Sequence, residues 1–248
     1  TLRGFVTDSL TAEALVYANA YIKELNKGAN SDSRGYFLIP GIPTNKTYQL
    51  TISYVGYKTK TISIRVTKEK VVQYNIQLQA EGIQLNTITQ IGERYKEKNE
   101  TNVSVQRISA REIEIMPKGV ETDVFRSIKY LAGVQSTGDV SAKYYVRGGA
   151  SNQNLVLIDN VTIYNPFHAL GLFSVVDPDM INNIEFFKGG FSAEYGGRLS
   201  SVMSIITKDG NKNRLSGKAT ASFLTGKILL EGPIPNGSFI LTGRKSYS

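Results

Sequence analysis

The chain has 248 residues, of which 41% are hydrophobic and 20% charged, and this composition predicts a folded protein of more than one domain. It contains no cysteine and one histidine, His168, so disulfides are excluded and no metal or other cofactor site is expected. The net charge of +8 divides into +5 over residues 1–80, −1 over 81–213 and +4 over 214–248 without a dense basic run, which argues against nucleic-acid binding.

No stretch approaches the roughly 18 consecutive apolar residues of a transmembrane helix. The first ten residues, TLRGFVTDSL, already have the pattern of folded sequence and lack the charged start and apolar segment of a signal peptide. We therefore expect either a chain from which a leader was removed or a fragment of a longer protein.

Residues 1–80 consist of short runs rich in Val, Ile, Tyr and Thr that are separated by turn residues. Between Tyr48 and Tyr54 apolar and polar side chains alternate, which predicts a strand with one buried and one exposed face. No helical pattern interrupts these runs. We predict a small antiparallel β-sandwich.

The next segment, residues 81–107, changes character. An extended apolar and polar stretch at residues 83–91 precedes a charged run at residues 93–100. The charged run is typical of a solvated linker. The stretch before it could add a strand to the edge of a partner's sheet, and a plain linker is the alternative interpretation.

Residues 108–213 combine helical and strand patterns. Ser109 and Glu112 have the spacing of a capping box, which predicts a short helix that ends before Pro117. A second helix would place Val124, Ile128 and Leu131 on one face. Strand patterns follow in KYYVRGG, NLVLIDNVTIY, NIEFFKGG and SVMSIITK. This organisation predicts an α+β fold around a small sheet.

Residues 214–248 read as strands again. Small apolar and polar side chains alternate in GKATASFL, and two further strand patterns are joined through Asn236–Gly237, a strong hairpin signal. Apolar side chains on one face and polar ones on the other, at a period of two, are typical of a strand that faces lipid.

Two glycine pairs, Gly189–Gly190 and Gly196–Gly197, raise the question of a phosphate site. A phosphate loop needs the spacing G-x-x-x-x-G-K-[ST] or G-x-G-x-x-G at the start of a helix, and these glycines give neither. Close approach of backbone in a crowded space is the interpretation that we favour. No paired carboxylates or nucleophile pattern indicates an enzyme.

The first segment resembles the carboxypeptidase regulatory-like (transthyretin-type) β-sandwich domain. The resemblance rests on SDSRGYF at residues 31–37 and SYVGY at residues 53–57. Asp32 and Gly35 suit a tight turn there, and Phe37 and Tyr54 suit inward-facing anchors. An enzyme is not implied, because the zinc-binding His and Glu residues of the metallopeptidase are not in this chain.

Residues 108–213 resemble the plug domain of TonB-dependent outer-membrane receptors. Asn160 stands where that family usually has Gly, and Asn also tolerates positive φ in a turn. The matching motifs are Arg147–Gly148, LIDNV at residues 157–161, Ile184–Glu185 with Lys188–Gly189, YGG at residues 195–197 and IITK at residues 205–208. A sandwich, a linker, a plug and a barrel follow one another in many receptors of Bacteroidetes-type bacteria.

The resemblance implies a multi-domain protein with β and α+β parts. The parts would be a sandwich at residues 1–80, a linker with a candidate TonB box at 81–107, a plug at 108–213 and the first strands of a truncated outer-membrane β-barrel at 214–248. Energy-coupled import of an unidentified ligand follows, with no enzymatic activity and with the sandwich in the periplasm. The implied partners are TonB, outer-membrane lipids and a small ligand, with a surface lipoprotein left open. A soluble periplasmic or surface binding and signalling module without a barrel stays as the alternative.

Three sets of residues are expected to carry this function. The candidate TonB box comprises Ile83, Leu85, Thr87, Ile88, Thr89 and Ile91. The expected polar contacts between the plug and the barrel wall are Arg147, Glu185, Lys188 and Arg198, with ordinary surface charges as the alternative. The expected ligand-facing loop residues are Asn152, Gln153, Tyr164, Phe167, His168 and Phe173.

Overall fold

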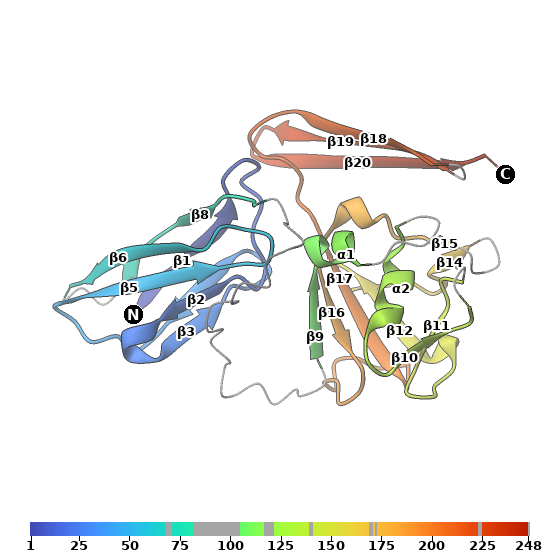
Figure 1. Cartoon of the computed structure of the whole chain (residues 1–248), viewed down its shortest axis with the longest axis horizontal. Coiled ribbons are helices and arrows are strands. Elements are labelled where there is room, and N and C mark those ends of the chain that lie inside the picture. The colour runs from blue at the N-terminus through green and yellow to red at the C-terminus, as the bar shows by residue number, and fades with distance from the viewer. Residues whose placement is uncertain are drawn as a thin grey trace. The chain divides into compact units, whose positions relative to one another are not determined.

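The computed structural model describes residues 1–67, 71–81, 105–116, 122–138, 141–168, 171, 173–222 and 225–247 (Figure 1). The chain divides into two compact units. The first comprises Thr1–Glu100, Gly210–Arg214 and Pro233–Gly237, and the second comprises Thr101–Asp209, Leu215–Gly232 and Ser238–Ser248. Within the described ranges, no helix has both the length and the apolar composition needed to cross a membrane.

The first unit contains a β-sandwich. One sheet has the order β3-β2-β5-β6 and is antiparallel throughout: β2 (Asn19–Ile22), β3 (Lys27–Asn30), β5 (Lys46–Ser53) and β6 (Lys60–Val66). The other sheet is built around β1 (Leu2–Asp8), and contains β4 (Tyr36–Ile39), β7 (Val72–Gln73) and β8 (Ile76–Leu78). A short 3-10 helix, η1 (Lys23–Leu25), connects β2 and β3.

The predicted sandwich is confirmed, but one of its sheets is mixed rather than antiparallel. β1 pairs antiparallel with β4 and parallel with both β7 and β8. The reason is that β6 belongs to the opposite sheet. The chain crosses over after β6 and enters the first sheet beside β1 in the same direction, as a crossover connection allows.

The core of the sandwich follows the alternation seen in the sequence. Tyr48, Leu50 and Ile52 on β5 are buried, together with Phe37 on β4. Each fully buried side chain of this size contributes about 1.5–3 kcal/mol relative to an exposed one. Asp32 forms the expected turn by accepting hydrogen bonds from the backbone N–H groups of Arg34 and Tyr36 at 2.8 and 2.9 Å.

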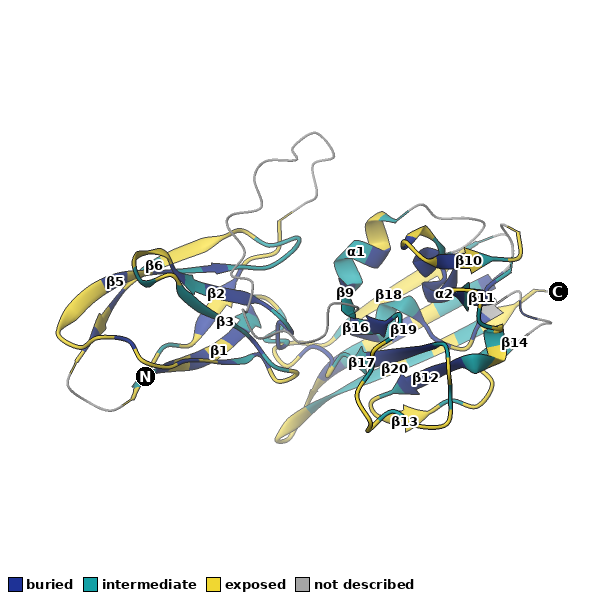
Figure 2. Ribbon diagram, turned by 90° about the horizontal axis from the view of Figure 1, so that it is seen from below, coloured by how far each residue is buried: buried dark blue, intermediate teal, exposed yellow. Residues whose placement is uncertain are grey.

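The second unit is built on a five-stranded sheet of order β13-β12-β17-β16-β9. β12 and β17 pair parallel and the other neighbours antiparallel. Its strands are β9 (Val105–Ser109), β12 (Asn154–Ile158), β13 (Val161–Thr162), β16 (Ile181–Phe187) and β17 (Ser201–Thr207). Figure 2 shows that β12 and β16 are mostly buried, whereas β13 is exposed.

Two short helices, α1 (Ala110–Ile115) and α2 (Val124–Ser127), lie on one face of this sheet (Figure 1). The predicted capping box starts α1: the N–H of Ser109 donates to Glu112 Oε2 at 2.7 Å. α2 continues as the 3-10 helix η2 (Ile128–Tyr130). The buried apolar residues that we predicted for one helix therefore lie on two short helices and the residue after them. Small pieces complete the unit: β10 (Val134–Ser136), β11 (Tyr144–Val146), η3 (Ser151–Gln153), β14 (Phe167–His168), β15 (Phe173–Ser174) and η5 (Pro178–Met180).

The opposite face of the sheet is covered by the glycine-containing loop. Phe191 and Tyr195 pack on a small cluster that includes Phe187, whose ring centroid lies 5.3 Å from that of Tyr195. For the loop to turn back onto the sheet, Gly189 and Gly190 adopt φ values of 143° and 64°.

Backbone torsion is therefore the chief requirement for glycine at Gly189 and Gly190. Gly197 also has a positive φ, of 81°. A Cβ atom at Gly190, Gly196 or Gly197 would meet nothing within 4 Å in the described part of the chain. The close approach that we expected is thus not found at these three positions. The positive φ accounts for Gly190 and Gly197, whereas the described structure shows no requirement for glycine at Gly196.

A separate three-stranded antiparallel sheet has the order β18-β19-β20. It consists of β18 (Ser216–Ala221), β19 (Thr225–Ile234) and β20 (Gly237–Ser246). The predicted hairpin is present, but its turn lies one residue earlier, at Pro235–Asn236, and Gly237 begins β20. Asn236 has a φ of 65°, which Asn tolerates.

A glycine in the sandwich core offers a stability test. A Cβ atom at Gly4 on β1 would overlap the carbonyl oxygen of Tyr74, which is backbone and cannot move aside cheaply. Gly4→Ala should lower the free energy of unfolding of the sandwich by about 1–3 kcal/mol or more. Gly243→Ala, where nothing lies within 4 Å, is the control and should be neutral in chemical denaturation. Equal midpoints for the two variants would contradict the packing seen at Gly4.

Candidate functional site

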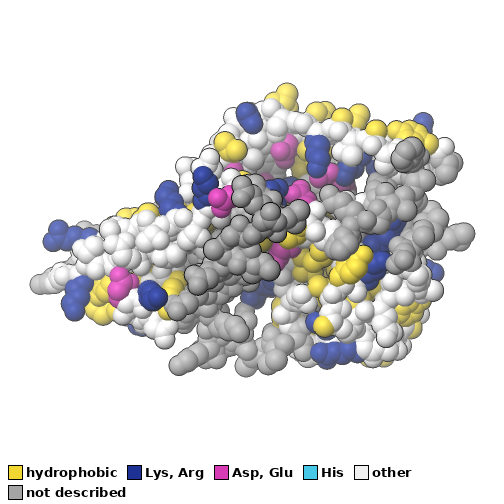
Figure 3. All heavy atoms as spheres, viewed as in Figure 1, with side chains coloured by type: hydrophobic (Ala, Val, Ile, Leu, Met, Phe, Trp, Pro, Cys, Tyr) yellow, Lys and Arg dark blue, Asp and Glu magenta, His cyan; other side chains and the backbone are white. Residues whose placement is uncertain are grey.

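The sheet β18-β19-β20 has one apolar and one polar face. Ala219 lies opposite Ile228 in the β18–β19 ladder, and residues directly opposite each other share a face. Ile228 is 58% exposed and Leu241 on β20 is 62% exposed. Figure 3 shows hydrophobic side chains gathered along this sheet at the upper edge of the view.

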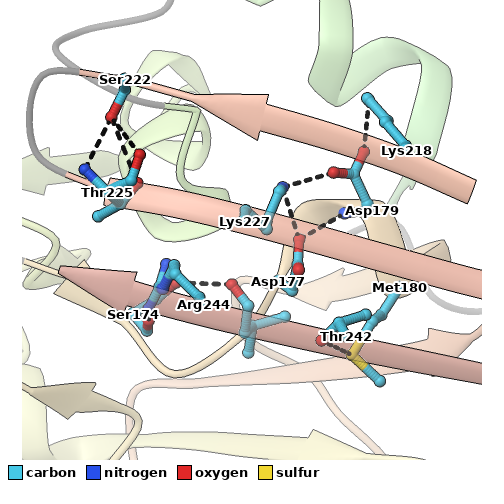
Figure 4. A network of polar contacts seen from close by, with 11 residues as sticks. Ser174, Asp177, Asp179, Met180, Lys218, Ser222, Thr225, Lys227, Thr242 and Arg244 are labelled. Carbon is cyan, nitrogen blue, oxygen red and sulfur yellow. Dashed lines mark hydrogen bonds and ion pairs between the residues drawn. The ribbon is translucent and has the colours of Figure 1, made fainter.

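The polar face carries lysines that reach acidic side chains around η5. Lys227 Nζ lies 2.9 Å from Asp177 Oδ1 and also contacts Asp179 Oδ2 (Figure 4). Lys218 Nζ lies 2.8 Å from Asp179 Oδ1. The side chain of Lys227 is only 15% exposed and that of Lys218 is 55% exposed, so Lys227 is the shielded member of the network.

Asp177 and Asp179 are placed by η5 itself. The side chain of Asp177 accepts a hydrogen bond from the N–H of Asp179 at 3.0 Å, and Pro178 between them suits the first helical position. The two carboxylates therefore project from one short turn, where a single ammonium group can lie between them.

β20 contacts the same unit at a different point. Arg244 Nη2 donates a hydrogen bond to the carbonyl oxygen of Ser174 at 2.7 Å. The N–H of Ser174 donates in turn to Asp123 Oδ2 at 2.8 Å, and Asp123 Oδ1 accepts from the N–H groups of Phe125 and Arg126 at the start of α2. A continuous chain of hydrogen bonds thus joins β20 to the buried end of α2.

The lysines control the ionisation of Asp179. Burial alone would raise the pKa of this carboxyl group, but hydrogen bonds and charge attraction from Lys218 and Lys227 outweigh it, so the pKa lies below its ordinary value of 3.8. Asp179 therefore stays ionised at neutral pH. The ion pairs of Lys218 and Lys227 with Asp177 and Asp179 can fasten two elements together, and these four residues have no arrangement of acid, base and nucleophile.

The four residues predicted to contact a barrel wall make contacts inside the second unit. Glu185 forms an ion pair of 3.1 Å with Arg107 across the β16–β9 ladder. Lys188 Nζ donates to the carbonyl oxygen of Ala132 at 3.0 Å. Arg198 donates to the carbonyl oxygen of Gly197 at 3.2 Å, and Arg147 is exposed with a φ of 48°. Their contact with a wall stays a prediction.

The predicted ligand-facing residues differ in their exposure. Tyr164 is 88% exposed and Asn152 is exposed. Gln153 Oε1 is used within η3, where it accepts from the N–H of Ala150 at 3.0 Å. Phe167 packs against the core, with its ring centroid 5.3 Å from that of Phe125. The side chains of His168 and Phe173, and the whole candidate TonB box, lie outside what the structure describes.

Sequence reasoning missed the residues that the structure brings together at β18–β20. None of Asp177, Asp179, Lys218, Lys227 and Arg244 was among the expected site residues. Their signal was present in the strand pattern, because each of the three basic residues falls on the polar face of its own strand, where successive side chains alternate between the two faces. The acidic partners 39–50 positions away could not be identified from that pattern.

The comparison with known proteins agrees with this architecture. Residues 2–89 match the model of the CarboxypepD_reg-like domain, and residues 97–201 match that of the TonB-dependent Receptor Plug Domain. The chain joins a CarboxypepD_reg-like domain to a TonB-dependent receptor plug domain. Both resemblances predicted from the sequence are confirmed.

Three similar proteins carry the name of a receptor. The chain is 32% identical over 165 residues to the ferrienterobactin receptor of Escherichia coli (strain K12), which covers 59% of this chain and 22% of the receptor. The solved structures include a mutant of the ferric enterobactin receptor from Pseudomonas aeruginosa, at 20% identity and a TM-score of 0.44, covering 58% of this chain and 24% of the receptor. The siderophore receptor PirA from the same organism has 24% identity and a TM-score of 0.44, covering 58% and 28%.

The shielded lysine should matter more than its exposed neighbour. Lys227→Met leaves Asp177 and Asp179 without their shared partner and should lower the opening free energy around η5 by about 3 kcal/mol, near the lower end for buried pairs. Hydrogen exchange of peptides within residues 173–187 measures this free energy. Lys218→Met, the matched control, should cost less than about 1 kcal/mol because that pair is exposed. A larger effect at Lys218 would contradict this ranking.

Asp179 should also make the plug sensitive to acid. Because its pKa is lower in the folded state, its contribution is present above the ordinary value of 3.8 and is lost as the pH falls through the folded pKa. Asp179→Asn should lower the stability around η5 at pH 7 and flatten its fall below about pH 4. Hydrogen exchange corrected for the intrinsic effect of pH tests this, and parallel pH profiles for the two proteins would refute it.

Proposed function

We propose that this chain is the N-terminal part of a TonB-dependent outer-membrane receptor, with β18–β20 as the first strands of the barrel and the plug gating its lumen. The observation that carries the proposal is the polar face of β18–β20, which is fastened to η5 and β15 of the plug while the other face is apolar. The receptor would import a ligand across the outer membrane with energy from TonB and would have no enzymatic activity.

The apolar and polar faces of β18–β20 support a position of this sheet between lipid and the plug. Strands of outer-membrane barrels alternate apolar side chains toward lipid with polar ones toward the lumen. Ile228 and Leu241 would face lipid, and Lys227 and Arg244 would face the plug. A buried charge without a partner is costly, so both basic side chains would favour the plug in its closed position.

Opening of the plug would require mechanical work that breaks the contacts of Lys227 and Arg244 with the plug. The candidate TonB box at residues 83–91 has the extended, β-branched composition that suits addition of a strand to a partner's sheet. Tension from TonB would enter the plug through β9, which lies at the edge of the sheet and pairs there with β16. On this route the sandwich, which precedes the box, would lie in the periplasm.

The names of the relatives suggest a first class of ligand. They are receptors for iron chelates, so ferric siderophores are the first ligands to test. Among the predicted ligand-facing residues, Tyr164 has a described aromatic side chain that is 88% exposed and could stack on an aromatic chelate. The cargo would also be set by barrel loops beyond the strands seen here.

The test uses the full-length protein in iron-starved cells. Deletion of residues 83–91 should reduce energised uptake of radiolabelled ferric enterobactin, or of another ferric siderophore from a screening panel, to the background level. Binding of the same chelate to de-energised cells should be retained. The control replaces the charged run at residues 93–100 with a Gly/Ser segment of equal length and should keep uptake.

Two outcomes would count against the proposal. Fractionation of the full-length protein with soluble periplasmic proteins would favour the binding and signalling module. Unchanged energised uptake after the deletion would remove the TonB box from residues 83–91.

A further inference from the structure

Within the first unit, the turn of residues 8–13 is fixed by one buried carboxylate. Asp8 is 6% exposed, and its Oδ1 accepts hydrogen bonds from the N–H groups of Leu10 and Thr11 at 2.6 and 2.9 Å. Its Oδ2 accepts from the hydroxyl of Tyr57 at 2.8 Å. Burial, together with this bond to Asp8, raises the pKa of Tyr57 well above its ordinary value, so the phenol stays a donor.

The backbone of the turn is also constrained. Ala12 has a φ of 57°, which is uncommon for a residue with a side chain, and its N–H donates to the carbonyl oxygen of Asp8 at 3.0 Å. Three donors to one carboxylate and a closed backbone ring hold the turn in a single conformation. The carbonyl groups of Leu10 and Thr11 therefore have fixed positions.

These two carbonyl groups bind a distant segment of the same chain. Asn213 Nδ2 donates to the carbonyl oxygen of Leu10 at 2.7 Å across 203 positions of sequence. The N–H of Lys212 donates to the carbonyl oxygen of Thr11 at 2.9 Å. Residues 210–214 belong to the same compact unit as the sandwich, although they follow β17 in the chain.

The distant segment has a defined shape of its own. Asn211 is buried, and its Oδ1 accepts from the N–H groups of Asn213 and Arg214 at 3.0 and 3.1 Å. Gly210, with a φ of 91°, allows the chain to turn immediately before it. A preformed segment meets a preformed turn, so little conformational entropy is lost when they associate.

We propose that the turn of residues 8–13 is an internal docking site for residues 210–214, through which the sandwich holds the connector between β17 and β18. The connector is the covalent link from the plug sheet to β18. Two exposed hydrogen bonds correspond to roughly a 10- to 100-fold preference for the docked state, so docking is reversible. The sandwich thereby acts as a releasable clamp on the connector, and this role does not depend on the ligand or on transport.

The test is hydrogen exchange of the whole chain, followed in peptides that cover residues 208–215. Asn213→Ala removes the side-chain bond and should speed exchange in this region by about 3- to 10-fold, the factor for one net hydrogen bond. Peptides within residues 46–53 report the sandwich core and should not change. Asn152→Ala removes an exposed amide in the other unit and should leave residues 208–215 unaffected.

Asp8→Ala tests the turn from its other side. It should speed exchange of residues 208–215 more than Asn213→Ala does, since both carbonyl groups lose their fixed positions. If Asp8→Ala also speeds exchange of residues 46–53, the sandwich has unfolded in that variant. The Asn213→Ala variant alone then tests the docking proposal. Fast exchange of residues 208–215 in the unaltered chain, or the same rate with and without Asn213→Ala, would overturn the proposal.

Discussion

An ammonium group that is shielded from water must keep its anionic partners, and Lys227 meets this requirement with two carboxylates from one turn of the plug. The constraint acts on both sides. η5 must present Asp177 and Asp179 together, and β19 must place Lys227 on the polar face of its sheet. The apolar face that results is free to meet a different environment. The contrast between the two faces is the physical basis for the proposal that β18–β20 are barrel strands.

The plug keeps this arrangement in place because its sheet is packed on both faces. Helices and aromatic rings around Phe125 and Tyr144 cover one face, and the loop carrying Phe191 and Tyr195 covers the other. Asp123 joins the first of these layers to β15, which β20 contacts through Arg244. A displacement of β20 would therefore strain the hydrogen bonds of Asp123 at the start of α2, since hydrogen bonds to a buried carboxylate are costly to break.

Much of the fold could be predicted because its signals are local. The capping box of Ser109 and Glu112, the alternation around Leu50 and the turn at Asp32 each depend on residues a few positions apart. The mixed pairing of β1 could not be predicted, because it depends on which sheet β6 joins. For the glycine pairs the sequence indicated a backbone requirement, and the structure shows it as a positive φ at Gly189, Gly190 and Gly197 but not at Gly196.

Of the candidate sites, the sequence supplied residue types and spacing but not partners. Glu185 was singled out for a distant wall, and its described partner is Arg107 on the neighbouring strand. By itself the sequence determined the order of the domains, the local turns and caps, and the two-faced character of the last strands, since these follow from periodicity and short-range hydrogen bonding. Only the tertiary structure decided that Lys227 meets Asp177 and Asp179 and that Asn213 meets Leu10. Such pairs join residues tens to hundreds of positions apart, and their choice depends on how whole elements pack.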